Sequence, residues 1–95
     1  MRKIVWSPRA LDDLQRGFHF ISAENPRRAH EWLEHVFHQV ERLIRFPGIG
    51  RQIPELDRKA RYRQMIVGDH RIFHEVRDKE VFIFRILHSR QIFED

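Results

Sequence analysis

The stretch that decides the fold is residues 25–48, NPRRAHEWLEHVFHQVERLIRFPG. Asn25 followed by Pro26 is typical of a helix start, because asparagine caps the free N–H groups and proline fits the first helical position. Apolar residues then recur with the 3.6-residue period of an α-helix; they are Ala29, Trp32, Leu33, Val36, Phe37, Val40, Leu43 and Ile44. The Pro47-Gly48 pair ends the pattern. The sequence therefore predicts one helix of about 30 Å between these signals.

A second helix is predicted immediately before this one. Ser7-Pro8 repeats the start signal, and an apolar stripe follows at three- and four-residue steps through Leu11, Leu14, Phe18 and Ile21. This pattern stops near residue 23, so we expect the two helices to form a hairpin. Residues 3–6, ahead of the start signal, have the composition of a short strand.

The second half of the chain predicts a sheet. After a loop over residues 48–59, three runs rich in Ile, Val, Phe and Tyr cover residues 61–67, 70–77 and 81–88. The breaks between the runs are short enough for hairpin turns. We predict an α+β fold of order β-α-α-β-β-β, in which an antiparallel sheet packs against the N-terminal helical hairpin, and a single domain over residues 1–95.

Composition excludes several classes of protein. The chain has 95 residues, no cysteine and a net charge of +4 at pH 7, so we expect one small core and neither a disulfide framework nor a cysteine-type zinc site. No apolar run is long enough for a signal peptide or a membrane span, which predicts a cytoplasmic protein without membrane contact. Fifteen of the 18 Lys and Arg residues are arginine, whose planar guanidinium group favours an acidic protein or a nucleic acid as partner.

The arginines of the sheet half are the first candidate binding residues. Neighbouring strands lie about 5 Å apart, so guanidinium groups from three strands can meet at one anion-binding surface. The candidates are Arg61, Arg63, Arg71, Arg85 and Arg90, with His88 between the last two. The alternative, a solvated face, is preferred for Arg58, Lys59 and Arg77.

No metal or cofactor site is predicted. His30, Glu34 and His38 recur at four-residue spacing, but they lie opposite the apolar stripe and lack the HExxH order, which is typical of a polar helix face. Gly48 and Gly50 follow a helix rather than a strand, which is the wrong context for a phosphate-binding loop.

His88 raises the question of catalysis. Cleavage of RNA needs a base for the 2′-hydroxyl, cations around the phosphorane oxygens and a proton donor to the leaving oxygen. Glu55 as the base, Arg61 or Arg63 as the cation and His88 as the proton donor are the residues that would fill these roles. A histidine at a strand end is more often bonded to a backbone carbonyl than catalytic, so the residues alone favour a protein that is not an enzyme.

Four segments resemble, in order and separation, motifs of the RelE/ParE toxin superfamily: WSPRALDDL at 6–14, FPGIGR at 46–51, VGDHRIF at 67–73 and RILHSR at 85–90. The resemblance covers nearly the whole chain and implies the toxin half of a type II toxin–antitoxin module, with the fold predicted above. The long second helix and the FPGIGR and RILHSR segments are more similar to the ParE branch, which implies inhibition of DNA gyrase without catalysis.

Two alternatives stay open beside the ParE branch. The RelE branch implies a ribosome-dependent mRNA endonuclease, in which Glu55, Arg63 and His88 sit where some relatives keep catalytic groups. A non-toxic nucleic-acid-binding module is the other alternative, and it would bind with an affinity that falls steeply with salt.

The resemblance also implies a cognate antitoxin whose disordered C-terminal segment wraps the toxin, giving a hetero-oligomer. An exposed edge strand, an apolar hairpin surface and basic residues suit an amphipathic acidic segment. The expected contacts are Leu14, Phe18, Trp32 and Val36 on the helices, where these residues are not already part of the core, and Arg61, Arg71 and Arg85 on the sheet. The alternative for the four apolar residues is that all of them face the sheet.

Overall fold

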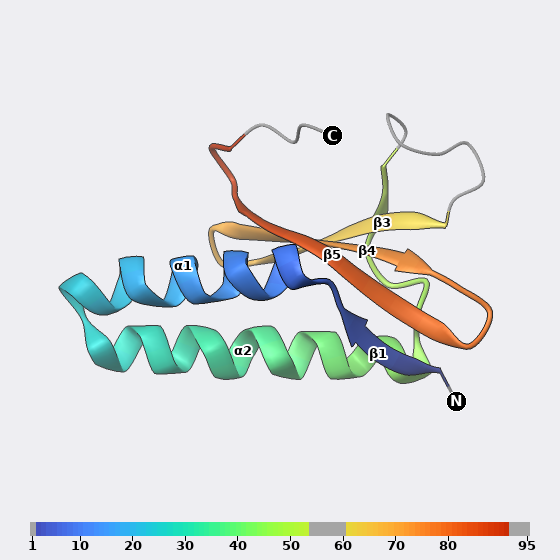
Figure 1. The fold of residues 1–95 in the computed structure, drawn as a ribbon, viewed down its shortest axis with the longest axis horizontal. Helices are drawn as coiled ribbons and strands as arrows, with labels where there is room; N and C mark the ends of the chain where they lie inside the picture. The colour runs from blue at the N-terminus through green and yellow to red at the C-terminus, as the bar shows by residue number, and fades with distance from the viewer. Residues whose placement is uncertain (1, 54–60, 92–95) are drawn as a thin grey trace.

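The computed structural model describes residues 2–53 and 61–91, and its α+β fold confirms the class predicted from the sequence. The chain runs through β1 (Lys3–Trp6), α1 (Pro8–Glu24), α2 (Pro26–Arg45), β2 (Arg51–Gln52), β3 (Tyr62–Val67), β4 (His70–Val76) and β5 (Glu80–His88). The two helices form a hairpin on one side of the sheet, and β1 lies beside β5 (Figure 1).

The sheet is mixed rather than wholly antiparallel. Its strand order is β1-β5-β4-β3-β2, and β3, β4 and β5 form the predicted antiparallel meander. β1 pairs with β5 in the parallel sense, from Lys3 opposite Glu80 to Trp6 opposite Ile83, which corrects the prediction at this edge. The four residues of β1 carry no pattern that distinguishes parallel from antiparallel pairing. The direction depends on the end of the sheet at which the chain re-enters the sheet after the helical hairpin.

A two-residue strand, β2, lies inside the segment predicted as a loop. Arg51 pairs with Gln64 and Gln52 pairs with Arg63, which is too short a run for any alternation to appear in the sequence. Gly50 precedes this strand with a φ of 100°, and a Cβ added there would lie 2.5 Å from the carbonyl oxygen of Gln64. Glycine therefore permits both the left-handed backbone and the close approach of the two strands.

Both predicted helix starts are confirmed. The Ser7 hydroxyl accepts the N–H of Ala10 at 2.9 Å, and the Asn25 side chain accepts the N–H of Arg28 at 3.2 Å. Each cap is followed by a proline in the first turn, as the sequence indicates. α2 ends at Arg45, two residues before the Pro47-Gly48 pair.

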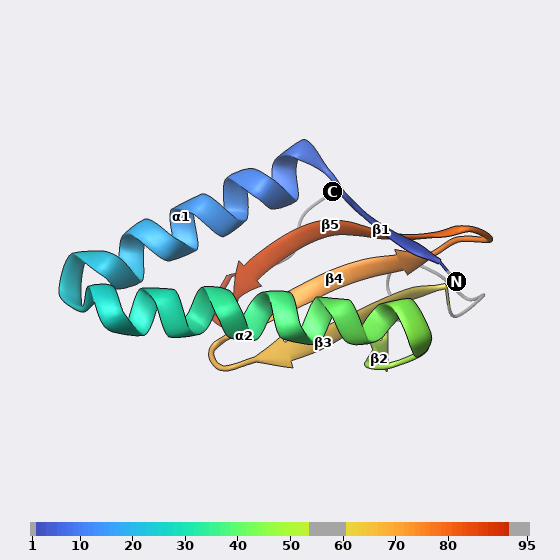
Figure 2. The same cartoon turned by 90° about the horizontal axis from the view of Figure 1, so that it is seen from below.

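The main core lies between the helical hairpin and the sheet (Figure 2). Its buried residues are Ala10, Leu14, Val36, Val40, Leu43, Met65, Val67, Ile72, Val81, Ile83 and Ile86. A smaller cluster of Ile53, Phe73 and Leu87 lies on the other face, since Ile72 and Phe73 are neighbours on one strand and point to opposite faces. Both faces of the meander are therefore apolar, which explains why the last strand does not alternate cleanly.

Gly17 sets how closely the two helices approach. A Cβ added to Gly17 would lie 2.6 Å from the Trp32 ring, which in turn lies against the His70 ring with centroids 4.8 Å apart. The indole is therefore held between α1 and the start of β4. This contact links the hairpin to the end of the sheet at which β5 finishes.

Candidate functional site

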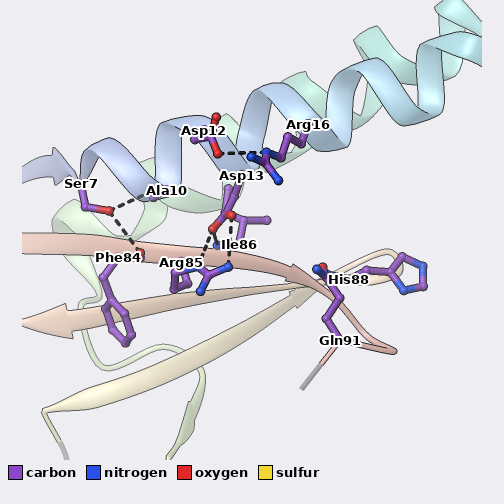
Figure 3. A network of polar contacts seen from close by, with 10 residues as sticks. All are labelled: Ser7, Ala10, Asp12, Asp13, Arg16, Phe84, Arg85, Ile86, His88 and Gln91. Carbon is purple, nitrogen blue, oxygen red and sulfur yellow. Dashed lines mark hydrogen bonds and ion pairs between the residues drawn. The ribbon is translucent and has the colours of Figure 1, made fainter. Parts of the chain in front are cut away.

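Beyond the end of β1, the outer edge of β5 forms hydrogen bonds with Ser7 and Asp13 instead of with a strand. The N–H of Ser7 donates to the carbonyl of Ile83 at 2.9 Å, and the Ser7 hydroxyl donates to the carbonyl of Phe84 at 3.1 Å. Asp13, from the second turn of α1, accepts the N–H of Ile86 at 2.9 Å (Figure 3). α1 is thereby fixed along the half of β5 that β1 does not cover.

Asp13 also fixes the side chain of Arg85. Nε and Nη2 of the guanidinium group donate to the two carboxylate oxygens at 2.8 and 3.3 Å. The pair is largely buried, with side-chain exposures of 14% for Arg85 and 11% for Asp13. The pair links β5 to α1, and the carboxylate of Asp13 already balances the positive charge of Arg85.

A pocket of about 810 Å³ lies between α1 and the end of β5, and we call it the α1–β5 pocket. Its lining residues are Asp13, Arg16, Gly17, Phe20, Asp69, His70, Arg85, Ile86, His88, Ser89, Arg90 and Gln91. Three predicted binding residues, Arg85, His88 and Arg90, therefore line one site. Arg16 and Phe20 were not predicted; the signal for them was their spacing on α1, three and seven residues after Asp13, which places them on one helix face.

His88 is oriented by the turn that follows β5. Its Nδ1 accepts the N–H of Arg90 at 3.1 Å, so the neutral ring carries its proton on Nε2. Its ring lies edge-on to His70, with centroids 5.3 Å apart. Burial lowers the pKa of His70, the nearby His88 lowers it further, and Asp69 opposes both effects. His70 is therefore held in its neutral form to a lower pH than an exposed histidine.

The structure does not bring all five predicted arginines together. Arg61 lies 3.8 Å from the carboxylate of Glu75, and Arg63 donates to the carbonyl of Gly50 at 3.0 Å. Arg71 donates to the carbonyl of Gln91, next to the α1–β5 pocket. The expectation of one cluster is corrected, because these side chains have separate partners that strand alternation cannot reveal.

The structure does not bring Arg63 and His88, two of the residues considered for RNA cleavage, together in one site. Glu55 lies outside the described residues. The strand registers align Arg63 with His74 and Ile83, and His88 with His70 and Val67. The backbone positions of Arg63 and His88 are therefore four residues apart along the strand direction, which is about 13 Å. In addition, β4 lies between β3, which carries Arg63, and β5, which carries His88.

Two of the four predicted hairpin contacts belong to the core. Leu14 is 7% exposed and Val36 is fully buried, so both pack on the sheet and are corrected as partner contacts. Phe18 and Trp32 are half-buried; Phe18 contacts His30 with ring centroids 5.2 Å apart. The apolar stripes of α1 and α2 are wider than the helix faces that the sheet covers. The large apolar residues of these stripes that stay exposed are Leu11 on α1 and Phe37 on α2, at 45% and 42%.

No group of three metal-ligating side chains occurs among residues 2–53 and 61–91. His30, Glu34 and His38 are exposed on α2. Neither α1 nor α2 is long and apolar enough to cross a membrane.

The chain is thus a small α+β domain in which a helical hairpin packs on a mixed five-stranded sheet, with a pocket lined by arginines and histidines between α1 and the end of β5. The family described as "ParE toxin of type II toxin-antitoxin system, parDE" matches residues 4–93, and the chain belongs to this family. The resemblance noted in the sequence is thereby confirmed.

Solved structures share the fold, and two of them are toxins or toxin–antitoxin systems by their descriptions. The chromosomal ParDE toxin–antitoxin system from P. aeruginosa matches with a TM-score of 0.69 and 23% identity, covering 93% of this chain and 95% of that one. A YoeB/ParE toxin from Agrobacterium tumefaciens matches with a TM-score of 0.61 and 19% identity, covering 90% and 96%. No curated protein matches the sequence.

Proposed function

We propose that this ParE-family toxin arrests growth by inhibiting DNA gyrase in the cytoplasm, and that a cognate antitoxin neutralises it. The observation that carries the proposal is the family match over residues 4–93. The separation of Arg63 from His88 across the sheet supports inhibition by binding over catalysis of RNA cleavage. The surplus of arginine supports a macromolecular target recognised through acidic groups.

Gyrase inhibition is tested with purified toxin in two assays run in parallel. We expect the toxin to block supercoiling of relaxed plasmid by gyrase and to leave cleaved DNA, while cell-free translation of a reporter continues at its full rate. Loss of translation with unaffected supercoiling would contradict the gyrase target. If the toxin then cleaved mRNA, and His88→Ala or Glu55→Ala abolished that cleavage, the function would be that of a ribosome-dependent nuclease instead of a gyrase inhibitor.

The antitoxin is expected to use two exposed surfaces. One is the apolar hairpin surface of Leu11 and Phe37, where Trp6 contacts Phe37 edge-on with ring centroids 5.7 Å apart. The other is the outer edge of β3: β2 pairs only with Arg63 and Gln64, so Met65–Val67 have a strand partner on the β4 side alone within the described chain. An amphipathic helix suits the first surface and an extended segment suits the second.

The remaining expected contacts lie around these two surfaces. Phe18 and Trp32 are half-buried on the hairpin, and Arg61 and Arg71 lie on the sheet half. A disordered acidic C-terminal segment of the antitoxin would cover them as it folds, giving a hetero-oligomer.

Antitoxin binding is tested by co-expression and by growth rescue. We expect Leu11→Glu and Phe37→Glu to reduce co-purification of the antitoxin while growth arrest persists, since a charge on an apolar interface is desolvated without a partner. Glu34→Lys, an exposed change elsewhere on α2, is the matched control and should leave co-purification unchanged. Equal loss in all three variants would contradict a hairpin interface.

A further inference from the structure

The α1–β5 pocket contains cationic groups that the fold does not use. The Arg90 guanidinium has no partner among the described residues, and Arg16 has only an exposed ion pair with Asp12, in which the side chains are 80% and 56% exposed. Exposed pairs of this kind contribute little and exchange readily. Asp13, in contrast, is fully engaged by Arg85 and the Ile86 N–H. The other acidic lining residue is Asp69, which is exposed on the turn between β3 and β4. The pocket therefore presents hydrogen-bond donors and three arginines against two aspartates, one of which is already paired.

The turn that carries these donors is held in place on several sides. The N–H of Gln91 donates to the carbonyl of His88 at 2.9 Å, and the Gln91 side chain accepts the N–H of His88 at 2.7 Å. The N–H of Ser89 donates to the carbonyl of Asp69 at 2.7 Å. A turn fixed in this way loses little conformational entropy when it binds a ligand.

His88 presents one hydrogen-bond donor from this turn. Its Nδ1 is occupied by the Arg90 N–H, so Nε2–H is the group left for a ligand. Arg16 lies on α1 and His88 lies at the end of β5 (Figure 3), and both residues line the pocket. Donors from two walls and a guanidinium group from the turn suit a compact anion with several acceptor oxygens.

Phe20 adds a different chemistry. Its side chain is 75% exposed, and it lines the pocket one turn of α1 beyond Arg16. Proteins that bind single-stranded nucleic acid combine an exposed aromatic ring with cationic groups, because the base stacks on the ring while the cations hold the phosphate. The pocket volume of about 810 Å³ lies in the range of small-molecule sites.

We propose that the α1–β5 pocket binds a nucleoside phosphate, with Arg16, His88 and Arg90 around the phosphate group and the Phe20 ring against the base. The ligand is either a free nucleotide or one nucleotide unit of a single strand. This site is separate from the hairpin surface proposed for the antitoxin, and it does not depend on whether gyrase is the target.

The test is a titration of the folded toxin followed by NMR and calorimetry. The probes are AMP, inorganic phosphate, a six-residue oligo(dA) and a Glu-rich hexapeptide. We expect AMP to shift the amide signals of Ser89 and Arg90 and the ring signals of Phe20 and His88, and to bind more tightly than inorganic phosphate. Tighter binding of oligo(dA) than of AMP identifies a strand as the source of the nucleotide, and the reverse identifies a free nucleotide.

Three variants decide whether the pocket is responsible. Arg90→Ala should weaken AMP binding about tenfold or more, and Phe20→Leu about fivefold or more. Arg45→Ala, an exposed arginine at the end of α2, is the matched control and should change binding less than twofold. Circular dichroism verifies that each variant is folded, and Arg16→Ala replaces Arg90→Ala if the latter is not.

Four results would overturn the proposal. They are the absence of AMP binding, equal weakening by Arg45→Ala and Arg90→Ala, equal affinity for AMP and inorganic phosphate with no effect of Phe20→Leu, and tighter binding of the Glu-rich peptide than of AMP. The last result would assign the pocket to an acidic protein segment instead.

Discussion

The stability of the fold should depend on pH most strongly through His74, the more deeply buried of two histidines whose pKa values are lowered. The side chain lies on β4 and is fully buried, and its Nε2 donates to the carbonyl of Pro47 at 3.2 Å. Its Nδ1 has no hydrogen-bond partner among the described residues. Burial lowers the pKa of His74 to about 4, the bond to Pro47 opposes this shift, and the positive charge of Arg63 adds to it. The folded protein therefore holds His74 neutral.

The sign and size of the effect follow from the two states. The pKa of His74 is about 4 in the folded chain and 6.5 when unperturbed, so between these values the unfolded chain binds more protons. Stability is complete above pH 6.5 and falls as the pH drops toward 4. A difference of about 2.5 pH units corresponds to about 3 kcal/mol of unfolding free energy, because each unit is worth about 1.4 kcal/mol. This is a large part of the stability of a small domain.

The measurement is urea unfolding followed by circular dichroism at several values between pH 7.5 and 4. We expect wild type to lose about 3 kcal/mol over this range beyond the loss in His74→Gln, which cannot gain a proton but keeps a donor for Pro47. His38→Gln, an exposed histidine on α2, is the matched control and should keep the wild-type slope. The same pH slope in wild type and His74→Gln would refute the reasoning.

Two further predictions concern contacts that hold α1. Asp13→Ala should lower the unfolding free energy by about 3 kcal/mol, because it leaves Arg85 largely buried without its carboxylate and the Ile86 N–H without an acceptor. Asp12→Ala, which breaks only an exposed pair, should cost about 0.5 kcal/mol or less, and equal losses in urea unfolding would contradict the role given to Asp13. Gly17→Ala should destabilise by about 1–3 kcal/mol, although alanine favours helices, because its Cβ meets the Trp32 ring. Urea unfolding with tryptophan fluorescence measures this, and a more stable variant would show that the ring moves freely.

The helices could be predicted because their signals are local. Ser7 and Asn25 each cap a helix within three residues of their own position, so four consecutive residues contain the whole interaction. The antiparallel meander of β3, β4 and β5 could also be predicted from the sequence, since short turns join strands that are neighbours in the chain. The direction of β1 could not be predicted, because its partner strand β5 lies at the far end of the sequence and either pairing sense suits a strand with only three apolar residues.

The candidate site was predicted in part for the same reason. The sequence placed Arg85, His88 and Arg90 together because they are close along one strand and the turn after it. It could not show that Arg85 is neutralised, since its partner Asp13 is 72 residues away. His74 gave no signal either: an alternating strand position looks the same whether its face is solvated or covered by the turn after α2.

The two long edges of the sheet also differ in a way that only the register reveals. Beside β5, backbone groups of Ile83, Phe84, Ile86 and His88 are already bonded to Ser7, Asp13 or Gln91. Beside β3, the N–H of Ile53 donates to the carbonyl of Tyr62, so alternate residues from Tyr62 onward turn their backbone groups toward β2. Ile66 is the next such residue beyond the end of β2, and its side chain is 75% exposed. An extended segment of a partner therefore has a template beside β3, whereas the groups along β5 are occupied by the chain itself.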